Sequence, residues 1–265
     1  MKGPKRSRFA AVRSLAAVAG LGWLTACASK SAPPPAAAAT PSASPAPQTA
    51  QPAAVAPSER ATGPEDLLAR AAAQPVVPFE GEGWTPLLDG KTLAGWKETA
   101  FAGRGEVECT NGLVVLNMGD PFTGIQWTND PPHGSYEVAL DALRLMGTDF
   151  FCGLTFPVRD SFCSLIVGGW GGGLVGLSSL DGYDASENET THSLSFERGH
   201  WYRIRLRVTA DRIEVWIDQD KIINVATKDR RISLRPGDIE LSKPFGICAW
   251  QTTAALREIR LRELP

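Results

Sequence analysis

The sequence predicts an all-β fold, a two-sheet jelly-roll β-sandwich formed by residues 76–265. Apolar and polar residues alternate along many short segments from Trp84 onward. Turn-forming residues separate these segments at intervals of about 8 to 12 residues. No segment after Ala73 carries the apolar stripe of a helix. A domain of this length suits about twelve strands in two packed sheets.

The clearest strands lie in the C-terminal half of the chain. In YRIRLRV (202–208), four large side chains fall on one face and three arginines on the other. RIEVWID (212–218) repeats this alternation after a short turn, and IINVAT (222–227) follows a second turn. Three further strands are predicted at SYEVALDAL (135–143), FGICAW (245–250) and LREIRLREL (256–264). We expect the arginine face to be solvated and to pair with acids such as Glu214 and Asp218.

The first 26 residues predict a lipoprotein signal peptide. A basic start, MKGPKRSR, precedes a short apolar stretch, and Leu24-Thr25-Ala26 leads directly into Cys27. A cysteine in this position resembles the bacterial lipobox, in which the thiol is acylated after cleavage; a plain signal peptide cut elsewhere is the alternative. The apolar stretch is too short and too interrupted for a stable transmembrane helix. We therefore expect a cell-envelope protein that is anchored only by its N-terminal lipid, on the periplasmic or surface side of the outer membrane.

A linker is predicted between this anchor and the sandwich. Residues 28–62 consist of Ala, Pro, Ser, Thr and Gln with almost no charge and no large apolar side chain. Such a segment buries too little to offset its conformational entropy, which predicts a disordered tether. PEDLLARAAA (64–73) predicts a short helix, because a proline start and early acids are typical of a helix N-terminus. The tether, including Cys27 and this helix, is thus expected over residues 27–75.

The charge balance bears on the class of partner. The full chain has 27 basic and 29 acidic residues, and residues 1–26 contain five of the basic residues and no acidic one. Removal of the signal peptide would leave 22 basic against 29 acidic residues, a formal charge of −7. This balance argues against nucleic acid as a partner and allows a neutral ligand such as a sugar.

Cysteine usage leaves two alternatives. Four cysteines follow Cys27: Cys109, Cys152, Cys163 and Cys248. If the intervening turn centres on residues 157–158, Cys152 lies opposite Cys163 and a disulfide can form. If the turn centres on residues 159–160, Cys152 lies opposite Val167 and the thiols stay free. The chain contains no CxxC pair, which argues against a zinc site.

Three motifs resemble the 3-keto-disaccharide hydrolase domain family. WTPLLDGKTLAGWK (84–97) is similar to the start of that domain, with Leu88-Asp89-Gly90-Lys91 at its centre. GHWYRIRLRVTADRIEVWIDQDKII (199–223) and PFGICAWQTTAALREIRLREL (244–264) are similar to its last strands. The resemblance spans about Trp84 to Leu264. It implies a concanavalin A-like lectin/glucanase fold, also described as laminin-G-like, in exported or lipid-anchored bacterial proteins.

The resemblance also implies hydrolysis of 3-keto-disaccharides or other 3-keto-glycosides. A ketone at C3 acidifies the C2 proton, so a general base can remove it and the C1 group can then be expelled. Water adds back, and the net result is hydrolysis. Such a site needs a base near C2 and an arginine, a histidine or a metal ion for the enolate oxygen. A non-catalytic carbohydrate-binding module and a structural envelope protein are the alternatives.

The central strands depart from the pattern of that family. Gly153 matches the family's strand glycine, but Pro157 occupies the position at which the family carries an arginine. The next strand, CSLIVGG (163–169), lacks the family's Glu and Gln. Arg159 is the candidate substitute for the missing arginine, and Asp149 lies near the position of the family's polar pair.

The segment GGWGGGLVGLSSLDGYDASENETT (168–191) supplies the other candidate residues. Strand glycines leave a sheet face unfilled, which predicts a groove with Trp170 as a platform for a sugar ring. Asp184 and Glu187 are the candidate bases. Further candidate ligand contacts are Asp149, Asp181, Asn188, Glu189 and Gln251, and the carboxylates are candidate ligands of a divalent cation such as Ca²⁺. The alternative is that the glycines mark bulges and the acidic loop is solvated surface.

Overall fold

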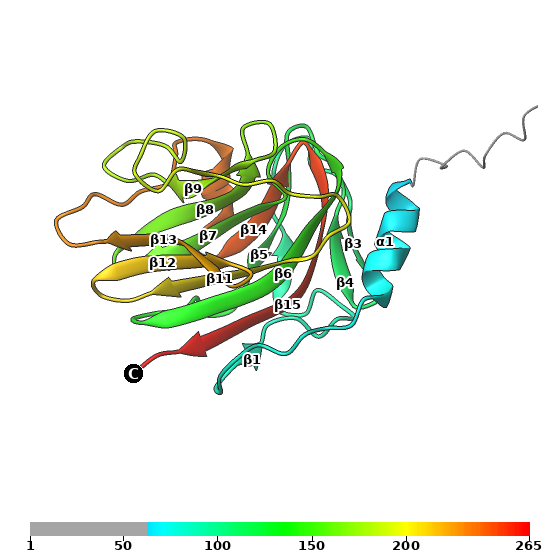
Figure 1. Cartoon of the computed structure of the whole chain (residues 1–265), viewed down its shortest axis with the longest axis horizontal. Helices are drawn as coiled ribbons and strands as arrows, with labels where there is room; N and C mark the ends of the chain where they lie inside the picture. Colours follow the sequence, from blue (N-terminus) through cyan, green and yellow to red (C-terminus); the bar gives the residue numbers. More distant parts are fainter. Residues whose placement is uncertain (1–62) are drawn as a thin grey trace, which may run out of the picture. The chain divides into compact units, whose positions relative to one another are not determined.

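Two antiparallel sheets form the sandwich in the computed structural model, which describes residues 63–265 (Figure 1). The predicted all-β fold is confirmed. The predicted signal peptide, Cys27 and the tether up to residue 62 lie outside the described residues. Within residues 63–265, no helix is both long and apolar enough to cross a membrane.

The first sheet has eight strands. In spatial order they run β13-β12-β11-β6-β15-β4-β3, and β1 pairs with the far end of β15. Their bounds are β1 Thr85–Pro86, β3 Val107–Thr110, β4 Leu113–Leu116, β6 Tyr136–Gly147, β11 Tyr202–Val208, β12 Arg212–Ile217, β13 Asp220–Ala226 and β15 Thr252–Glu263. The two long strands, β6 and β15, pair at the centre of this sheet.

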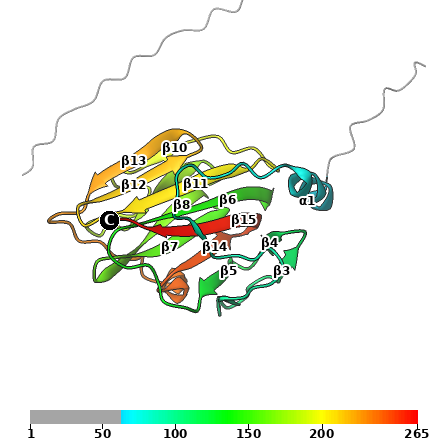
Figure 2. The same cartoon turned by 90° about the horizontal axis from the view of Figure 1, so that it is seen from below.

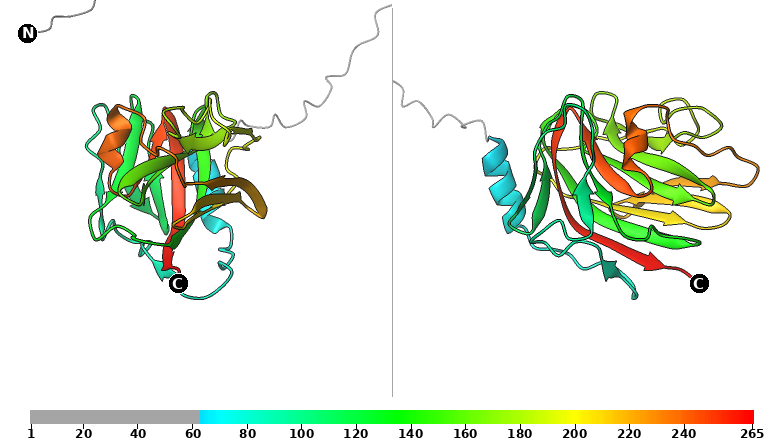
Figure 3. Two further views of the ribbon diagram at one scale, coloured as in Figure 1. Left: turned by 90° about the vertical axis from the view of Figure 1, so that its left-hand side faces the viewer. Right: turned by 180° about the vertical axis from the view of Figure 1, so that it is seen from behind.

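The second sheet has seven strands, in the order β10-β9-β8-β7-β14-β5-β2. Their bounds are β2 Trp96–Glu98, β5 Phe122–Trp127, β7 Cys152–Val158, β8 Ser161–Gly169, β9 Leu174–Ser178, β10 His192–Ser193 and β14 Gly246–Trp250. A 3₁₀ helix, η1 (Asp238–Ser242), contacts β14 and β5 of this sheet (Figure 3). The second sheet therefore carries a partial cover on its outer face.

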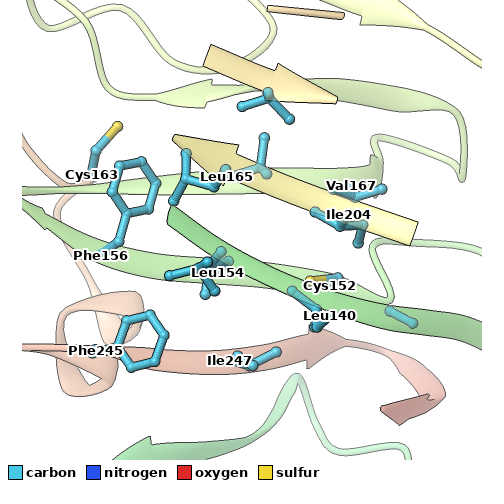
Figure 4. Close-up of a cluster of buried hydrophobic side chains, with 14 of the residues drawn as sticks. Leu140, Cys152, Leu154, Phe156, Cys163, Leu165, Val167, Ile204, Phe245 and Ile247 are labelled. Carbon is cyan, nitrogen blue, oxygen red and sulfur yellow. The ribbon is translucent and has the colours of Figure 1, made fainter. Parts of the chain in front are cut away.

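The core lies between the sheets and consists of the inward residues of each alternating strand (Figure 4). The predicted inward face of β11 is confirmed: Ile204 and Leu206 are fully buried, and Leu140 of the neighbouring β6 joins them. Leu154, Phe156 and further residues of the second sheet face them. Close packing of two such apolar faces is the main source of stability in a sandwich.

The expected short helix forms as α1 (Pro64–Ala73), and it packs on the outer face of the eight-stranded sheet (Figure 2). Ala71 is fully buried against this face, and its carbonyl accepts a hydrogen bond from the Trp201 indole at 3.0 Å. The carbonyls of Gln74 and Pro78 accept hydrogen bonds from Arg257 at 2.9 Å and Arg203 at 3.0 Å. The helix and the residues after it therefore belong to the folded domain.

The expectation of a solvated arginine face on β11 is wrong in part. Arg207 Nε donates to Glu137 at 2.5 Å, and Arg203 Nε donates to Asp141 at 2.9 Å. Both acids lie on the neighbouring strand β6 and are buried. Glu214 does pair with Arg207, at the longer distance of 3.4 Å. The covering N-terminal segment explains the difference, because it removes much of this face from water.

The disulfide alternative is excluded, because Cys152 and Cys163 are free. The turn between β7 and β8 centres on residues 159–160, so Cys152 lies opposite Val167. Cys163 instead lies opposite Phe156. Burial raises the pKa of the Cys163 thiol to about 12, which keeps it protonated and unreactive.

Candidate functional site

A cavity of about 480 Å³ lies on the outer face of the seven-stranded sheet. Its base is formed by residues of β8 and β9 that point away from the core, such as Ser164 and Ser178. The β6–β7 loop, the β8–β9 turn and the segment that leads into η1 form its walls. The cavity is thus assembled from segments that lie far apart in the sequence.

Beside these two serines, the floor of the cavity is largely apolar. Its apolar lining residues include Phe122, Phe150, Ile166, Trp170 and Trp250. The ring centroids of Phe122 and Trp250 lie 4.6 Å apart in an edge-on arrangement, and Phe122 also stacks on Phe101 at 4.7 Å. Trp170 is the most exposed of these residues, because 45% of it is accessible to solvent. Such a floor fits the C–H face of a sugar ring, and an exposed tryptophan adds a second flat surface.

Asp184 holds an arginine at one wall of the cavity. Its Oδ1 accepts hydrogen bonds from the Ser178 hydroxyl and, at 2.7 Å, from the Ala185 amide. Its Oδ2 accepts a hydrogen bond from Arg235 Nη1 at 2.7 Å. Both oxygens are therefore occupied, and the role that the geometry supports for Asp184 is to position Arg235, not to accept a proton.

Asp149 is a second carboxylate of the cavity, and one of its oxygens is free. Its Oδ1 accepts a hydrogen bond from the Phe150 amide at 2.8 Å. Its Oδ2 receives no hydrogen bond from residues 63–265 and is open to a ligand. The side chain is partly buried beside the aromatic floor. Among the sequence-predicted residues, Asp149, Trp170 and Asp184 are brought together in this cavity.

The residues that η1 and the segment before it contribute to the cavity could not be predicted from the sequence. Arg235, Asp238 and Ile239 all line the cavity. Ile239 packs into the small apolar cluster above the sheet, together with Phe150 and Cys248. The only local signal is the turn-like sequence Arg-Pro-Gly-Asp at 235–238, which does not indicate where the turn lies relative to the sheets.

Two other carboxylates of the acidic loop, Asp181 and Glu189, pair with an arginine and do not line the cavity. Arg230 Nε donates to Asp181 at 2.6 Å, and Arg230 also pairs with Glu189. The Arg231 backbone N–H, followed by Arg230, lowers the pKa of Asp181, and Arg230 likewise lowers the pKa of Glu189. Across residues 63–265, no group of three or more His, Cys, Asp or Glu could hold a metal ion. The carboxylates of the loop are thus offset by basic side chains of the 228–235 segment.

Asn188 and Glu187, which also belong to the acidic loop, do not line the cavity. The Asn188 amide donates to the carbonyls of Leu177 at 2.8 Å and Asp184 at 2.7 Å. Its oxygen accepts from the Thr190 amide at 2.9 Å. Asn188 therefore ties the loop to β9. Glu187 is exposed and does not line the cavity.

Arg159 and Gln251 also lie outside the cavity lining. Arg159 sits in the β7–β8 turn, and its guanidinium donates to the carbonyl of Thr227 at 2.8 Å. Gln251 follows the cavity residue Trp250, but it is exposed, and its backbone amide donates to the Pro121 carbonyl at 2.7 Å. Arg235 is the arginine that the fold places at the cavity.

The motif at residues 88–91 forms a turn and not a site. Asp89 Oδ1 accepts hydrogen bonds from the amides of Thr92 at 2.7 Å and Lys91 at 2.8 Å. The Thr92 amide, then that of Lys91, lowers the pKa of Asp89 to about 2. The Asp89 carboxylate thereby accepts the hydrogen bonds of two backbone amides that have no carbonyl partner in this tight turn. Asp and Gly are both typical of such turns.

The fold and the cavity together define a concanavalin A-like β-sandwich with an aromatic-floored site on one sheet. Residues 83–262 match the family described as the 3-keto-alpha-glucoside-1,2-lyase-like domain. The chain belongs to this family, which is the 3-keto-disaccharide hydrolase family that its motifs resemble. Membership relates the protein to carbohydrate chemistry.

Several solved structures are similar to this chain at low identity. A protein of unknown function with a galectin-like fold from Bacillus subtilis has a TM-score of 0.49 and 12% identity, covering 70% of this chain and 97% of its own. Domain 4 of AbnA, an extracellular arabinanase from Geobacillus stearothermophilus in complex with arabinotriose, has a TM-score of 0.45 and 15% identity, covering 68% and 91%. The carbohydrate binding module CBM66 from Bacillus subtilis has a TM-score of 0.43 and 14% identity, covering 64% and 96%. The comparison with curated proteins gives no match.

Proposed function

We propose that this protein cleaves the C1–oxygen bond of 3-keto-glycosides in the cavity on its seven-stranded sheet. The observation that carries the proposal is that Asp149, with one free carboxylate oxygen, and Arg235, held by Asp184, line the same aromatic-floored cavity. Membership of the 3-keto-alpha-glucoside-1,2-lyase-like family supports the choice of substrate.

The proposed reaction begins at C2 of the sugar. Asp149 removes the C2 proton, and the electrons of that bond form an enolate on the C3 oxygen. The enolate then re-forms the C3 carbonyl, a C1–C2 double bond forms, and the C1–oxygen bond breaks to release the leaving group. The proton held by Asp149 passes to the leaving oxygen, and addition of water across the double bond then places a hydroxyl on C1 and a solvent proton on C2, which completes a net hydrolysis.

Arg235 is the proposed electrophile for the enolate oxygen. Its Nη1 is committed to Asp184, and the other N–H groups of the guanidinium remain available for a ligand. A fixed cation near a developing oxyanion stabilises the transition state more than the ground state. The aromatic floor and Trp170 supply apolar surface for the ring, so orientation and charge stabilisation come from different residues.

The test uses the full-length protein with 3-keto-glucosides and their unoxidised parents. We expect sugar release from the keto forms only, and loss of deuterium from substrate labelled at C2. Asp149→Asn should lower the rate by about 10²-fold or more. Asp160→Asn, which removes an exposed carboxylate in the distant β7–β8 turn, is the matched control and should keep full activity.

Three outcomes contradict parts of this proposal. Release with the C2 deuterium retained would exclude the elimination route. Saturable sugar binding without release would make the domain a binding module. Activity lost with EDTA and restored by Ca²⁺ would show that a divalent cation is needed in addition to Arg235.

We also propose that the protein is exported and lipid-anchored through Cys27 in the cell envelope. The support is the sequence alone: a basic start, an apolar stretch and Leu-Thr-Ala before the cysteine. In this location the protein would meet oxidised glycosides outside the cytoplasm.

A further inference from the structure

Arg144 is a charged residue on the inner face of the sandwich. It follows Leu140 and Ala142 on the face of β6 that points to the core, and it is only 7% exposed. None of the salt bridges within residues 63–265 includes it, and its Nε has no hydrogen-bond partner there. Burial, followed by the charge of Arg198, lowers the pKa of Arg144, and the nearby carboxylate of Asp149 offsets this only in part, so a charge at this position costs stability.

The guanidinium instead contacts the turn between β8 and β9. Its Nη2 donates to the Gly172 carbonyl at 2.7 Å and weakly to the Gly168 carbonyl at 3.5 Å. Its central carbon lies 5.3 Å from the centroid of the Phe151 ring. Arg144 therefore reaches across from the eight-stranded sheet and connects both ends of a turn that belongs to the seven-stranded sheet.

The glycines of this turn make room for the guanidinium. A Cβ at Gly168 would lie 2.6 Å from Arg144 Nη2, and a Cβ at Gly172 would lie 2.8 Å from Nη1. Both glycines also have positive φ angles, of 81° and 109°, which side chains disfavour. The glycine run thus accommodates the arginine that supports the turn from inside.

Trp170 sits at the tip of this turn, with a positive φ of 47° that is uncommon for a large residue. The turn also lies close to the loop of the candidate base, because a Cβ at Gly172 would lie 3.0 Å from the Thr148 carbonyl. Trp170 and Asp149 line the same cavity. The position of the indole relative to Asp149 therefore depends on how the turn is held.

We propose that Arg144 is a positioning residue: it holds the β8–β9 turn so that Trp170 stacks on the sugar beside Asp149. The proposal rests on the function proposed above in its choice of ligand. It predicts that Arg144 acts on substrate only through Trp170, although the two side chains belong to different sheets.

A double-mutant cycle tests this coupling. Arg144→Met should raise KM for a 3-keto-glucoside by about tenfold and leave kcat nearly unchanged, because stacking contributes to ground-state and transition-state binding alike. Trp170→Ala should have a similar effect. The double variant should be no worse than Trp170→Ala alone, since the effects of coupled residues are not additive. Arg144→Lys keeps a donor for the Gly172 carbonyl and should restore part of the loss.

A second measurement does not depend on any sugar. Iodide quenching reports how exposed Trp170 is to solvent. The Trp170 signal is obtained as the difference between each protein and its Trp170→Phe counterpart. We expect the quenching of this signal to change in Arg144→Met. It should stay near the wild-type value in Arg198→Met, which removes a neighbouring exposed guanidinium. Additive losses in the cycle or unchanged quenching would overturn the positioning role. If the proposed reaction itself fails, turnover is absent in every variant, whereas the quenching result still decides the role of Arg144. If Arg144→Met does not fold, Arg144→Lys serves both measurements.

Discussion

Glu137 is expected to be a stability determinant of the eight-stranded sheet, and Glu137→Ala tests this. The carboxylate is fully buried on β6. Its Oε1 accepts a hydrogen bond from Arg207 Nε at 2.5 Å, and its Oε2 accepts one from Arg262 Nε at 2.6 Å. The alanine variant leaves two guanidinium groups without their shared counter-charge.

The expected loss in the free energy of unfolding depends on how well Arg207 and Arg262 are solvated or paired after the change. Removing one partner of a buried ion pair costs about 3–5 kcal/mol. The side chains of Arg207 and Arg262 are 33% and 16% exposed, so water can partly solvate them after the change. Arg207 also keeps its contact with Glu214 at 3.4 Å. We therefore expect the lower end of the range, about 3 kcal/mol, or a decrease in Tm of about 6–12 °C for a domain of this size.

Urea unfolding and a thermal scan measure this loss directly. Glu98→Ala is the matched control, because Glu98 pairs with Arg104 at 3.0 Å while both side chains are more than 40% exposed. The control should change the free energy of unfolding by about 0.5 kcal/mol or less. Equal losses for the two variants would refute the assignment of Glu137 as a buried counter-charge.

Three further predictions concern acid stability, thiol reactivity and acylation. The hydrogen bonds to Asp89 hold its pKa near 2, below its ordinary value of 3.8. The stabilisation from this carboxylate is therefore present above about pH 4 and is lost as the pH falls toward 2. In Asp89→Asn, the free energy of unfolding should depend less on pH across that interval, which urea unfolding at several pH values measures. Burial raises the pKa of all four thiols of the domain, so in the native protein Ellman's reagent should react, slowly, with the half-buried Cys109 and with the other three only after unfolding. Cys27→Ser should abolish incorporation of a fatty-acid label and release the protein from the membrane fraction; a labelled serine variant would contradict the lipobox assignment.

The strands could be read from the sequence because burial in a sandwich alternates with every residue. The inward face of β11 and the predicted hairpin with β12 are present in the structure. The strand β6 was predicted only in part: it continues past residue 143 to Gly147, and the charged Arg144 on its inner face breaks the apolar pattern. A period of two identifies a strand but does not reveal a charge that serves a turn on the opposite sheet.

The site could be predicted only where its residues are close in sequence. Trp170 and Asp184 could be predicted because an aromatic and an acidic residue stand out in the glycine-rich segment and the loop after it, and Asp149 because it lies near the position of the family's polar pair. Arg235 could not be predicted, because it lies more than fifty residues after Asp184 in the sequence. The two residues meet only because of the path that the chain takes from β13 to η1. Local patterns carry no information on such long-range contacts, and for the same reason the sequence predicts Arg159 as the arginine of the site.

The attachment of α1 has a consequence for how the domain is presented. The chain enters the described domain at Gly63, and α1 lies on the outer face of the eight-stranded sheet. The cavity opens on the outer face of the other sheet. The point at which the chain enters the described domain and the opening of the cavity therefore lie on opposite outer faces of the sandwich.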